Sequence, residues 1–283
     1  MSCEPTPPSN FSRAILETAG SSIDLFKAAL AIAADQYPNL DESKYDRQID
    51  SISAHVKSRI DGLTSPEARL TAINSVLFEE LRFAGNTRNY FDPRNSYLNE
   101  VIDRRTGIPI TLSVIYIEIA KRVGVSLEGV GMPFHFLVKH SGEADIFADI
   151  FIDPFNAGKL MDRSDCAALL DKLSGGSVSL LPEHLEAVSP AQILIRMLAN
   201  LAGIYIRQSD FDKALRFVDN ILLIDPICVP YVRDKALLLG ALGRWKLAAT
   251  AYERYVRLAP GAADAETVKD RLAEMRRDRA RLN

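Results

Sequence analysis

The sequence has little cysteine, no long apolar run and no strong excess of one charge. Its three cysteines, Cys3, Cys166 and Cys228, lie far apart along 283 residues. This spacing fits neither a disulfide framework nor a pair of closely spaced zinc ligands, so we expect no metal or cofactor site. The net charge is -3, with both signs interspersed. Because no basic stripe is present, we do not expect nucleic acid to be the partner.

The chain also lacks the features that direct a protein to or through a membrane. No stretch approaches the ~18 uncharged apolar residues of a spanning helix. The first ten residues, MSCEPTPPSN, show neither the positive segment nor the apolar segment of a secretory signal. We therefore expect a cytoplasmic protein with no membrane partner, whose residues 1–10 form a disordered tail.

Composition and periodicity indicate two domains. The sequence is 47% hydrophobic and 25% charged, and its length suits two domains of about 150 residues each. Residues 11–82 predict helices, because Tyr45, Ile49, Ile52, Val56 and Ile60 recur at steps of three to four and mark one apolar face. The run Ser65, Pro66, Glu67 predicts the start of another helix, with an N-cap oxygen and a proline at its first position.

Residues 83–160 predict an α/β core within a first domain that spans 11–188. The segment FAGNTRNYFDPRNSYLNEVIDRRTGIP is rich in turn residues and precedes a buried helix over 109–123 that ends at Gly124. Two runs rich in Phe, Val and Ile follow, and they predict antiparallel strands over 128–140 and 146–153, joined by a Ser-Gly-Glu turn. If the pairing centres near Ala144, His135 faces Asp153 across the sheet, as a base faces its orienting acid.

Residues 190–283 predict an all-helical repeat domain. Ala214 and Ala248 are 34 residues apart, as are Pro226 and Pro260, and this is the period of tetratricopeptide repeats. The first repeat fits at Leu198, Leu201, Ala202, Tyr205, Ala214, Val218 and Pro226. The second fits at Ala236, Leu239, Ala248, Tyr252 and Pro260, although Lys235 occupies a position that is usually apolar. A charged helix over 262–282 can cap the stack, and the repeats either bind a protein or peptide partner or only brace the first domain.

The segments NSYL and RRTGIPITLS, followed by GMPFHFLVK and IDPFNAG, resemble the SirB-type branch of the transglutaminase-like superfamily, whose members often carry tetratricopeptide repeats. The resemblance implies an α+β fold, a transglutaminase-like (papain-like) domain with a helical N-terminal region, followed by the all-α repeats. Two residues depart from the branch pattern. Phe134 and Ala157 stand where glycine is expected, and their larger side chains are expected to narrow the site.

Catalytically competent members of the superfamily have a cysteine at the start of the central helix, a histidine on a following strand and an aspartate on the next. The resemblance implies the same positions in this chain. Here His135 and Asp153 match the base and the acid, but Pro109, Ile110 and Thr111 occupy the start of the helix. None of the three cysteines lies there. Thr111 is the nearest hydroxyl that could replace the thiol, although a threonine at such a position is more often a helix cap.

The remaining candidate site residues are the polar set that precedes the central helix. It comprises Asn86, Asn95, Ser96, Tyr97 and Arg105. These side chains either line a pocket or satisfy backbone groups in ordered loops. His135 with Asp153 has the same two interpretations, a residual binding pocket or a hydrogen-bonded pair that rigidifies the domain.

Three functions remain open from the sequence. The first and favoured one is a non-catalytic transglutaminase-like protein that acts as a cytoplasmic interaction or regulatory module through its repeats. The second is a hydrolase or acyltransferase that uses His135 and Asp153 with a hydroxyl or water nucleophile. The third is a sensor that binds a small molecule or peptide end in the degenerate pocket. The sequence predicts no oligomeric state.

Overall fold

The computed structural model describes residues 9–17, 23–140 and 149–281, and the chain divides into two compact units, 1–197 and 198–283. Most of the predicted tail over 1–10 lies outside the described residues, but the first helix already begins at Asn10, where the side chain of Ser9 caps it. The boundary between the units falls inside one helix, α8 (Pro190–Arg207), whereas the sequence placed the domain boundary just before that helix.

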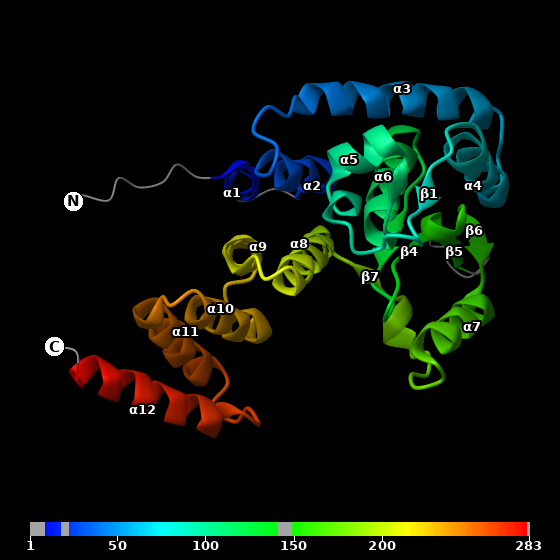
Figure 1. Cartoon of the computed structure of the whole chain (residues 1–283). Helices are drawn as coiled ribbons and strands as arrows, with labels where there is room; N and C mark the ends of the chain where they lie inside the picture. Colours follow the sequence, from blue (N-terminus) through cyan, green and yellow to red (C-terminus); the bar gives the residue numbers. More distant parts are fainter. Residues whose placement is uncertain (1–8, 18–22, 141–148, 282–283) are drawn as a thin grey trace. The chain divides into compact units, whose positions relative to one another are not determined.

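The first unit begins with helices, as predicted, and continues into an antiparallel sheet (Figure 1). Its helices are α1 (Asn10–Leu16), α2 (Leu25–Ala34), α3 (Glu42–Ile60), α4 (Pro66–Asn74), the π-helical η1 (Ser75–Glu80), α5 (Leu98–Arg104), α6 (Pro109–Arg122) and α7 (Arg163–Ser174). Short helical turns lie at η2 (Pro93–Asn95), η3 (Pro154–Asn156) and η4 (Pro182–Leu185). A two-residue parallel pair joins β1 (Ala84–Gly85) and β2 (Thr106–Gly107).

The main sheet has five antiparallel strands in the order β6-β5-β4-β3-β7. The strands are β3 (Glu128–Val130), β4 (Leu137–His140), β5 (Ile150–Asp153), β6 (Lys159–Met161) and β7 (Ala187–Val188). The predicted strand over 128–140 is therefore wrong in one respect, because residues 131–136 leave the sheet and the two ends of the run pair with each other. The predicted Ser-Gly-Glu turn and residues 146–148 of the second predicted strand lie outside the described residues.

The pairing of β4 with β5 is antiparallel, as predicted, but its register differs. A centre near Ala144 would pair Val138 with Ile150, whereas the sheet pairs Val138 with Ile152, a slip of two residues. An even slip keeps every side chain on its predicted face. His135 nevertheless lies before β4, in the turn that follows β3, and not opposite Asp153 within the ladder.

Helix α6 is the buried centre of the first unit. It begins at Pro109, as predicted, and Ile110, Val114, Ile115 and Ile119 are each at most 2% exposed. At its carboxyl end Arg122 binds three carboxylates, with 2.6 Å to Asp46 and 2.6 Å to Asp50 on α3 and 2.8 Å to Glu118. These contacts hold α6 against α3. The other end of α6, its start, belongs to the site described below.

In the second unit, every described element from residue 198 onward is a helix. After the end of α8 come α9 (Phe211–Ile224), α10 (Val229–Ala241), α11 (Trp245–Leu258) and α12 (Ala265–Arg281). The predicted repeat positions are buried: Leu198, Leu201, Ala202, Tyr205, Ala214, Val218, Ala236, Leu239, Ala248 and Tyr252. Pro226 and Pro260 follow α9 and α11, so the predicted all-helical repeat architecture is confirmed.

Candidate functional site

The structure brings His135 and Asp153 together. The imidazole Nε2 lies 2.9 Å from Asp153 Oδ1, and the two side chains are only 6% and 1% exposed. The ring N–H is poorly aligned with the carboxylate, so Nε2 has no well-directed hydrogen bond although it is sealed from solvent. At 2.9 Å the two groups attract each other electrostatically even without an aligned hydrogen bond.

Asp153 also organises the turn that follows β5. Its Oδ1 accepts hydrogen bonds from the backbone amides of Phe155 (3.1 Å) and Asn156 (3.2 Å), and its Oδ2 accepts one from Asn156 Nδ2 (2.7 Å). Burial raises the pKa of Asp153, but the contacts with His135 and Asn156 outweigh burial and hold this pKa below its ordinary value. The carboxylate thus remains ionised and caps η3.

Phe134 and Ala157, which stand where the resemblance leads us to expect glycine, flank this pair. Phe134 has φ +63° and Ala157 has φ +56°, in the left-handed region that side chains other than hydrogen disfavour. Both side chains are exposed, Phe134 to 60%. The backbone conformation, more than a shortage of space, therefore explains why glycine suits these two positions.

The start of α6 presents a hydroxyl that is already engaged. Thr111 Oγ1 accepts a hydrogen bond from the Ile108 amide (3.1 Å) and lies 2.8 Å from the Asn95 carbonyl, to which it donates. The Ile108 carbonyl is a second acceptor at 3.1 Å. Thr111 thus caps the helix from its first turn and ties it to the preceding loop. Ser113 is fully buried, and its Oγ finds no hydrogen-bond partner among the described residues.

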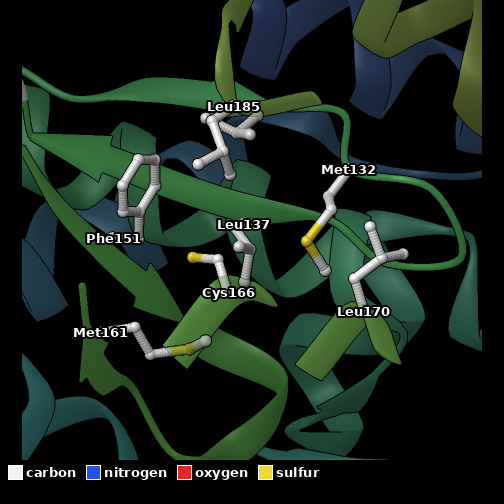
Figure 2. Packing of buried hydrophobic residues seen from close by; sticks show 8 residues of the cluster. Met132, Leu137, Phe151, Met161, Cys166, Leu170 and Leu185 are labelled. Carbon is white, nitrogen blue, oxygen red and sulfur yellow. The ribbon is translucent and has the colours of Figure 1, made fainter. Parts of the chain in front are cut away.

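The described cysteines lie in surroundings that disfavour a thiolate. Cys166, on α7, is fully buried among apolar side chains that include Met132, Leu137, Phe151 and Met161 (Figure 2). This burial, reinforced by nearby carboxylates, raises the pKa of Cys166 to about 12. Burial also raises the pKa of Cys228, which precedes α10 in the second unit. Cys3 lies outside the described residues.

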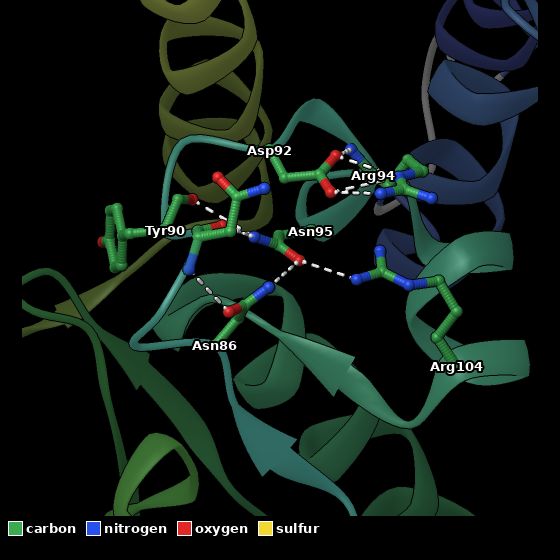
Figure 3. Close-up of polar contacts among 7 residues, drawn as sticks. Asn86, Tyr90, Asp92, Arg94, Asn95 and Arg104 are labelled. Carbon is green, nitrogen blue, oxygen red and sulfur yellow. Dashed lines mark hydrogen bonds and ion pairs between the residues drawn. The ribbon is translucent and has the colours of Figure 1, made fainter.

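Two residues of the predicted pocket set, Asn86 and Asn95, hydrogen-bond each other at 3.1 Å (Figure 3). Asn95 also donates to the backbone oxygens of Asn89 (2.8 Å) and Tyr90 (3.2 Å), and Arg104 donates to its Oδ1 at 3.4 Å. Asn95 is completely buried. These amides satisfy backbone groups of an ordered loop, which is one of the two interpretations left open by the sequence.

The other members of the predicted set have different surroundings. Ser96 and Tyr97 are each 1% exposed, and the Tyr97 ring packs edge-on against Tyr37 at 5.5 Å. Arg105 is exposed, and its Nη1 donates to the Leu81 carbonyl at 2.9 Å. Among the described residues, no group of three or more His, Cys, Asp or Glu side chains is arranged to hold a metal ion.

Sequence reasoning missed Arg196, a residue of α8 that holds the histidine turn. Its Nη2 donates to the backbone oxygens of His135 (2.6 Å) and Met132 (3.2 Å), and its guanidinium stacks over the Phe136 ring at 5.4 Å. It also missed Phe155, whose ring lies edge-on to the His135 ring at 5.9 Å. No sequence signal pointed to this role of Arg196. The apolar residues around it are explained by the helical repeat pattern alone.

Comparison with known proteins agrees with this geometry. Residues 43–199 match the sequence profile described as Transglutaminase-like superfamily. The chain belongs to the transglutaminase-like superfamily. Residues 201–273 match the profile described as Tetratricopeptide repeat, so the predicted combination of the two is confirmed.

Several named proteins are similar to this chain in sequence. A "UPF0162 protein" of Xylella fastidiosa is 35% identical over 261 residues, which cover 91% of this chain and 92% of the relative. A "UPF0162 protein" of Vibrio cholerae is 29% identical and covers 75% of this chain and 77% of its own. The mouse "F-box only protein 21" is 33% identical over 190 residues, or 62% of this chain and 28% of that protein. No solved structure matches the chain.

Proposed function

We propose that this chain is a non-catalytic transglutaminase-like protein of the SirB-type branch, acting as an interaction or regulatory module in the cytoplasm. One observation carries the proposal. The start of α6, where the resemblance requires a nucleophilic cysteine, holds Pro109, Ile110 and a Thr111 hydroxyl engaged in capping. Without a cysteine thiol at this helix N-terminus, the imidazole has no thiol proton to accept.

The surroundings of Cys166 support the same proposal. A thiol must ionise to attack, and a pKa of about 12 leaves almost no thiolate at neutral pH. Its apolar neighbours Met132 and Leu137 also keep substrate away from the sulfur. Cys166 is thus better suited to packing than to chemistry.

The interaction role is supported by the second unit and by the relatives. Tetratricopeptide repeats stack helix pairs into surfaces that generally bind other proteins, and we place the protein or peptide partner there. A match of 190 residues, 62% of this chain, also covers 28% of F-box only protein 21. A segment similar to much of this chain therefore occurs as one part of a longer protein, as expected of a module. Among the described residues, no helix is long and apolar enough to cross a membrane.

A second candidate is a hydrolase or acyltransferase, and the buried pair of His135 and Asp153 favours it. The 2.9 Å contact could orient an imidazole toward a bound water or a hydroxyl such as that of Thr111. The engaged state of the Thr111 hydroxyl argues against its use as the nucleophile.

The test is an assay for thiol-dependent transamidation and peptidase activity, with a catalytically competent superfamily member as positive control. We expect the wild type, Cys166→Ser and His135→Gln to show the same background rates. We also expect treatment of the folded protein with an alkylating agent to leave partner binding intact, since Cys166 is buried. Turnover that disappears in Cys166→Ser would restore a thiol enzyme. Turnover that survives alkylation but disappears in His135→Gln would establish the second candidate instead.

A further inference from the structure

Arg196 is a half-buried cation without a carboxylate partner. No described carboxylate lies within ion-pair distance of its guanidinium, and burial lowers its pKa. A guanidinium carries five N–H donors, of which Nη2 spends its two on the carbonyls of Met132 and His135. No described residue accepts a hydrogen bond from Nη1 or Nε, so these donors are available to a ligand. A bound anion would offset the cost of burying the positive charge.

A second donor, the Tyr90 hydroxyl, belongs to a ring cluster that reaches His135. Tyr90 packs edge-on against Phe155 at 6.2 Å, and Phe155 packs edge-on against His135 at 5.9 Å, so these rings link Tyr90 to the histidine. Arg196 binds the His135 carbonyl on the other side, so Tyr90 and Arg196 are both linked to the His135 turn. Figure 3 shows the Tyr90 ring pointing away from the network of Asn86, Asn95 and Arg104. No described residue hydrogen-bonds the Tyr90 hydroxyl.

The segments that carry Tyr90 and His135 also carry exposed aromatic side chains. Phe91 contacts Tyr90 at 5.4 Å and is 57% exposed, and Phe134, next to His135, is 60% exposed. Tyr90 itself is 39% exposed. Exposed aromatic side chains beside a desolvated cation suit a ligand that combines an apolar side chain with a negative charge.

We propose that Arg196 and Tyr90, next to the His135 turn, bind the C-terminal carboxylate of a peptide whose last residue is aromatic or large and apolar. The inference deepens the proposed interaction function by naming the chemistry of a partner for the first unit. A chain end is favoured because the guanidinium is half-buried, and a terminal carboxylate can approach it without a continuing backbone. The last side chain then packs on Phe91 and Phe134, while Arg196 forms a charge-assisted pair with the carboxylate.

The experiment uses the full chain and N-acetyl-phenylalanine as the probe. The chain has four histidines. The imidazole NMR signal of His135 can therefore be identified by comparison with His135→Gln. We expect a saturable shift of that signal, with the signals of His55 and His184 unchanged. N-acetyl-phenylalanine amide, which lacks the carboxylate, should bind about tenfold more weakly, as expected for one charge-assisted hydrogen bond.

Three variants and one further probe complete the test. Tyr90→Phe keeps the ring contacts and should weaken binding of the acid but not of the amide, and Arg196→Met should abolish the difference between the two probes. Arg163→Gln, which removes an exposed charge on α7, is the matched control and should change neither probe's binding.

Equal binding of acid and amide, or no saturable shift at His135, would overturn the site. N-acetyl-aspartyl-phenylalanine amide has a side-chain carboxylate but no terminal carboxylate. If it binds as tightly as N-acetyl-phenylalanine, the site does not require a chain end, and that part of the proposal is overturned. None of these readouts depends on turnover, so the site and the proposed function can fail separately.

Discussion

Replacing His135 with alanine tests whether the buried pair stabilises the fold or serves a reaction. The substitution removes the 2.9 Å contact with Asp153 and the edge-on ring contact with Phe155. Asp153 keeps three other donors, from Phe155 and Asn156, so its charge is not orphaned. The loss is therefore below the 3–5 kcal/mol of a fully broken buried pair, and we expect about 2 to 3 kcal/mol.

His135→Gln is the matched variant. Glutamine retains a donor for Asp153 but not the ring, so it should cost about 1 kcal/mol less than alanine. Urea unfolding followed by far-UV circular dichroism measures both values. The single tryptophan, Trp245, lies in the second unit, and its fluorescence should report an unchanged transition for that unit in either variant.

The effect should depend on pH in a defined direction. The folded-state pKa of Asp153 lies below its ordinary value, and His135 contributes to that depression. A depressed carboxyl pKa stabilises the fold at all pH values above the unfolded-state pKa of about 4, and this stability is lost as the pH falls through the folded-state value. The difference between wild type and His135→Ala should therefore narrow as the pH falls below about 4.

Two results would refute this reasoning. A His135→Ala variant with unchanged unfolding free energy but lost partner binding or turnover would reject the structural role and establish His135 as a working site residue. A stability difference that grows as the pH falls below about 4 would mean that Asp153 is not the carboxylate stabilised by the pair.

Three further predictions concern the residues around the pair. Phe134→Gly and Ala157→Gly should each stabilise the first unit by about 1 kcal/mol in urea unfolding, because both positions have positive φ; a loss of stability would contradict the left-handed backbone. Thr111→Val should cost about 1 to 3 kcal/mol through the unpaired Ile108 amide, whereas Thr111→Ser should cost much less. Arg122→Ala should cost about 2 kcal/mol, and hydrogen exchange should then increase at the contact of α3 with α6.

Helix starts could be predicted from the sequence because capping is local. Ser65 accepts a hydrogen bond from the amide of Ala68, three residues ahead, and Pro66 fills the first turn. Pro109 marks the start of α6 for the same reason. Such contacts join residues within one turn, so the identity of a few neighbours is enough to place them.

The strand containing His135 could not be placed in this way. Residues 128–140 are rich in Phe, Val and Leu and read as one strand, yet the chain leaves the sheet between Val130 and Leu137. Pro133 gave a partial signal, because proline cannot donate to a sheet hydrogen bond. The left-handed Phe134 gave none, since a bulky residue at positive φ persists only where tertiary contacts enforce it. The Arg196 hydrogen bond to the His135 carbonyl, between residues 61 apart, is one such contact.

These contacts also explain how a base and an acid can persist where no thiol is present. Asp153 caps η3 through the amides of Phe155 and Asn156, whether or not a nucleophile is nearby. The His135 carbonyl anchors Arg196, and its ring packs against Phe155. Losing a cysteine at the start of α6 would remove none of these interactions, whereas losing either member of the pair would disturb the turns beside it. The presence of His135 and Asp153 is therefore accounted for by structure, and it is not by itself an argument for turnover.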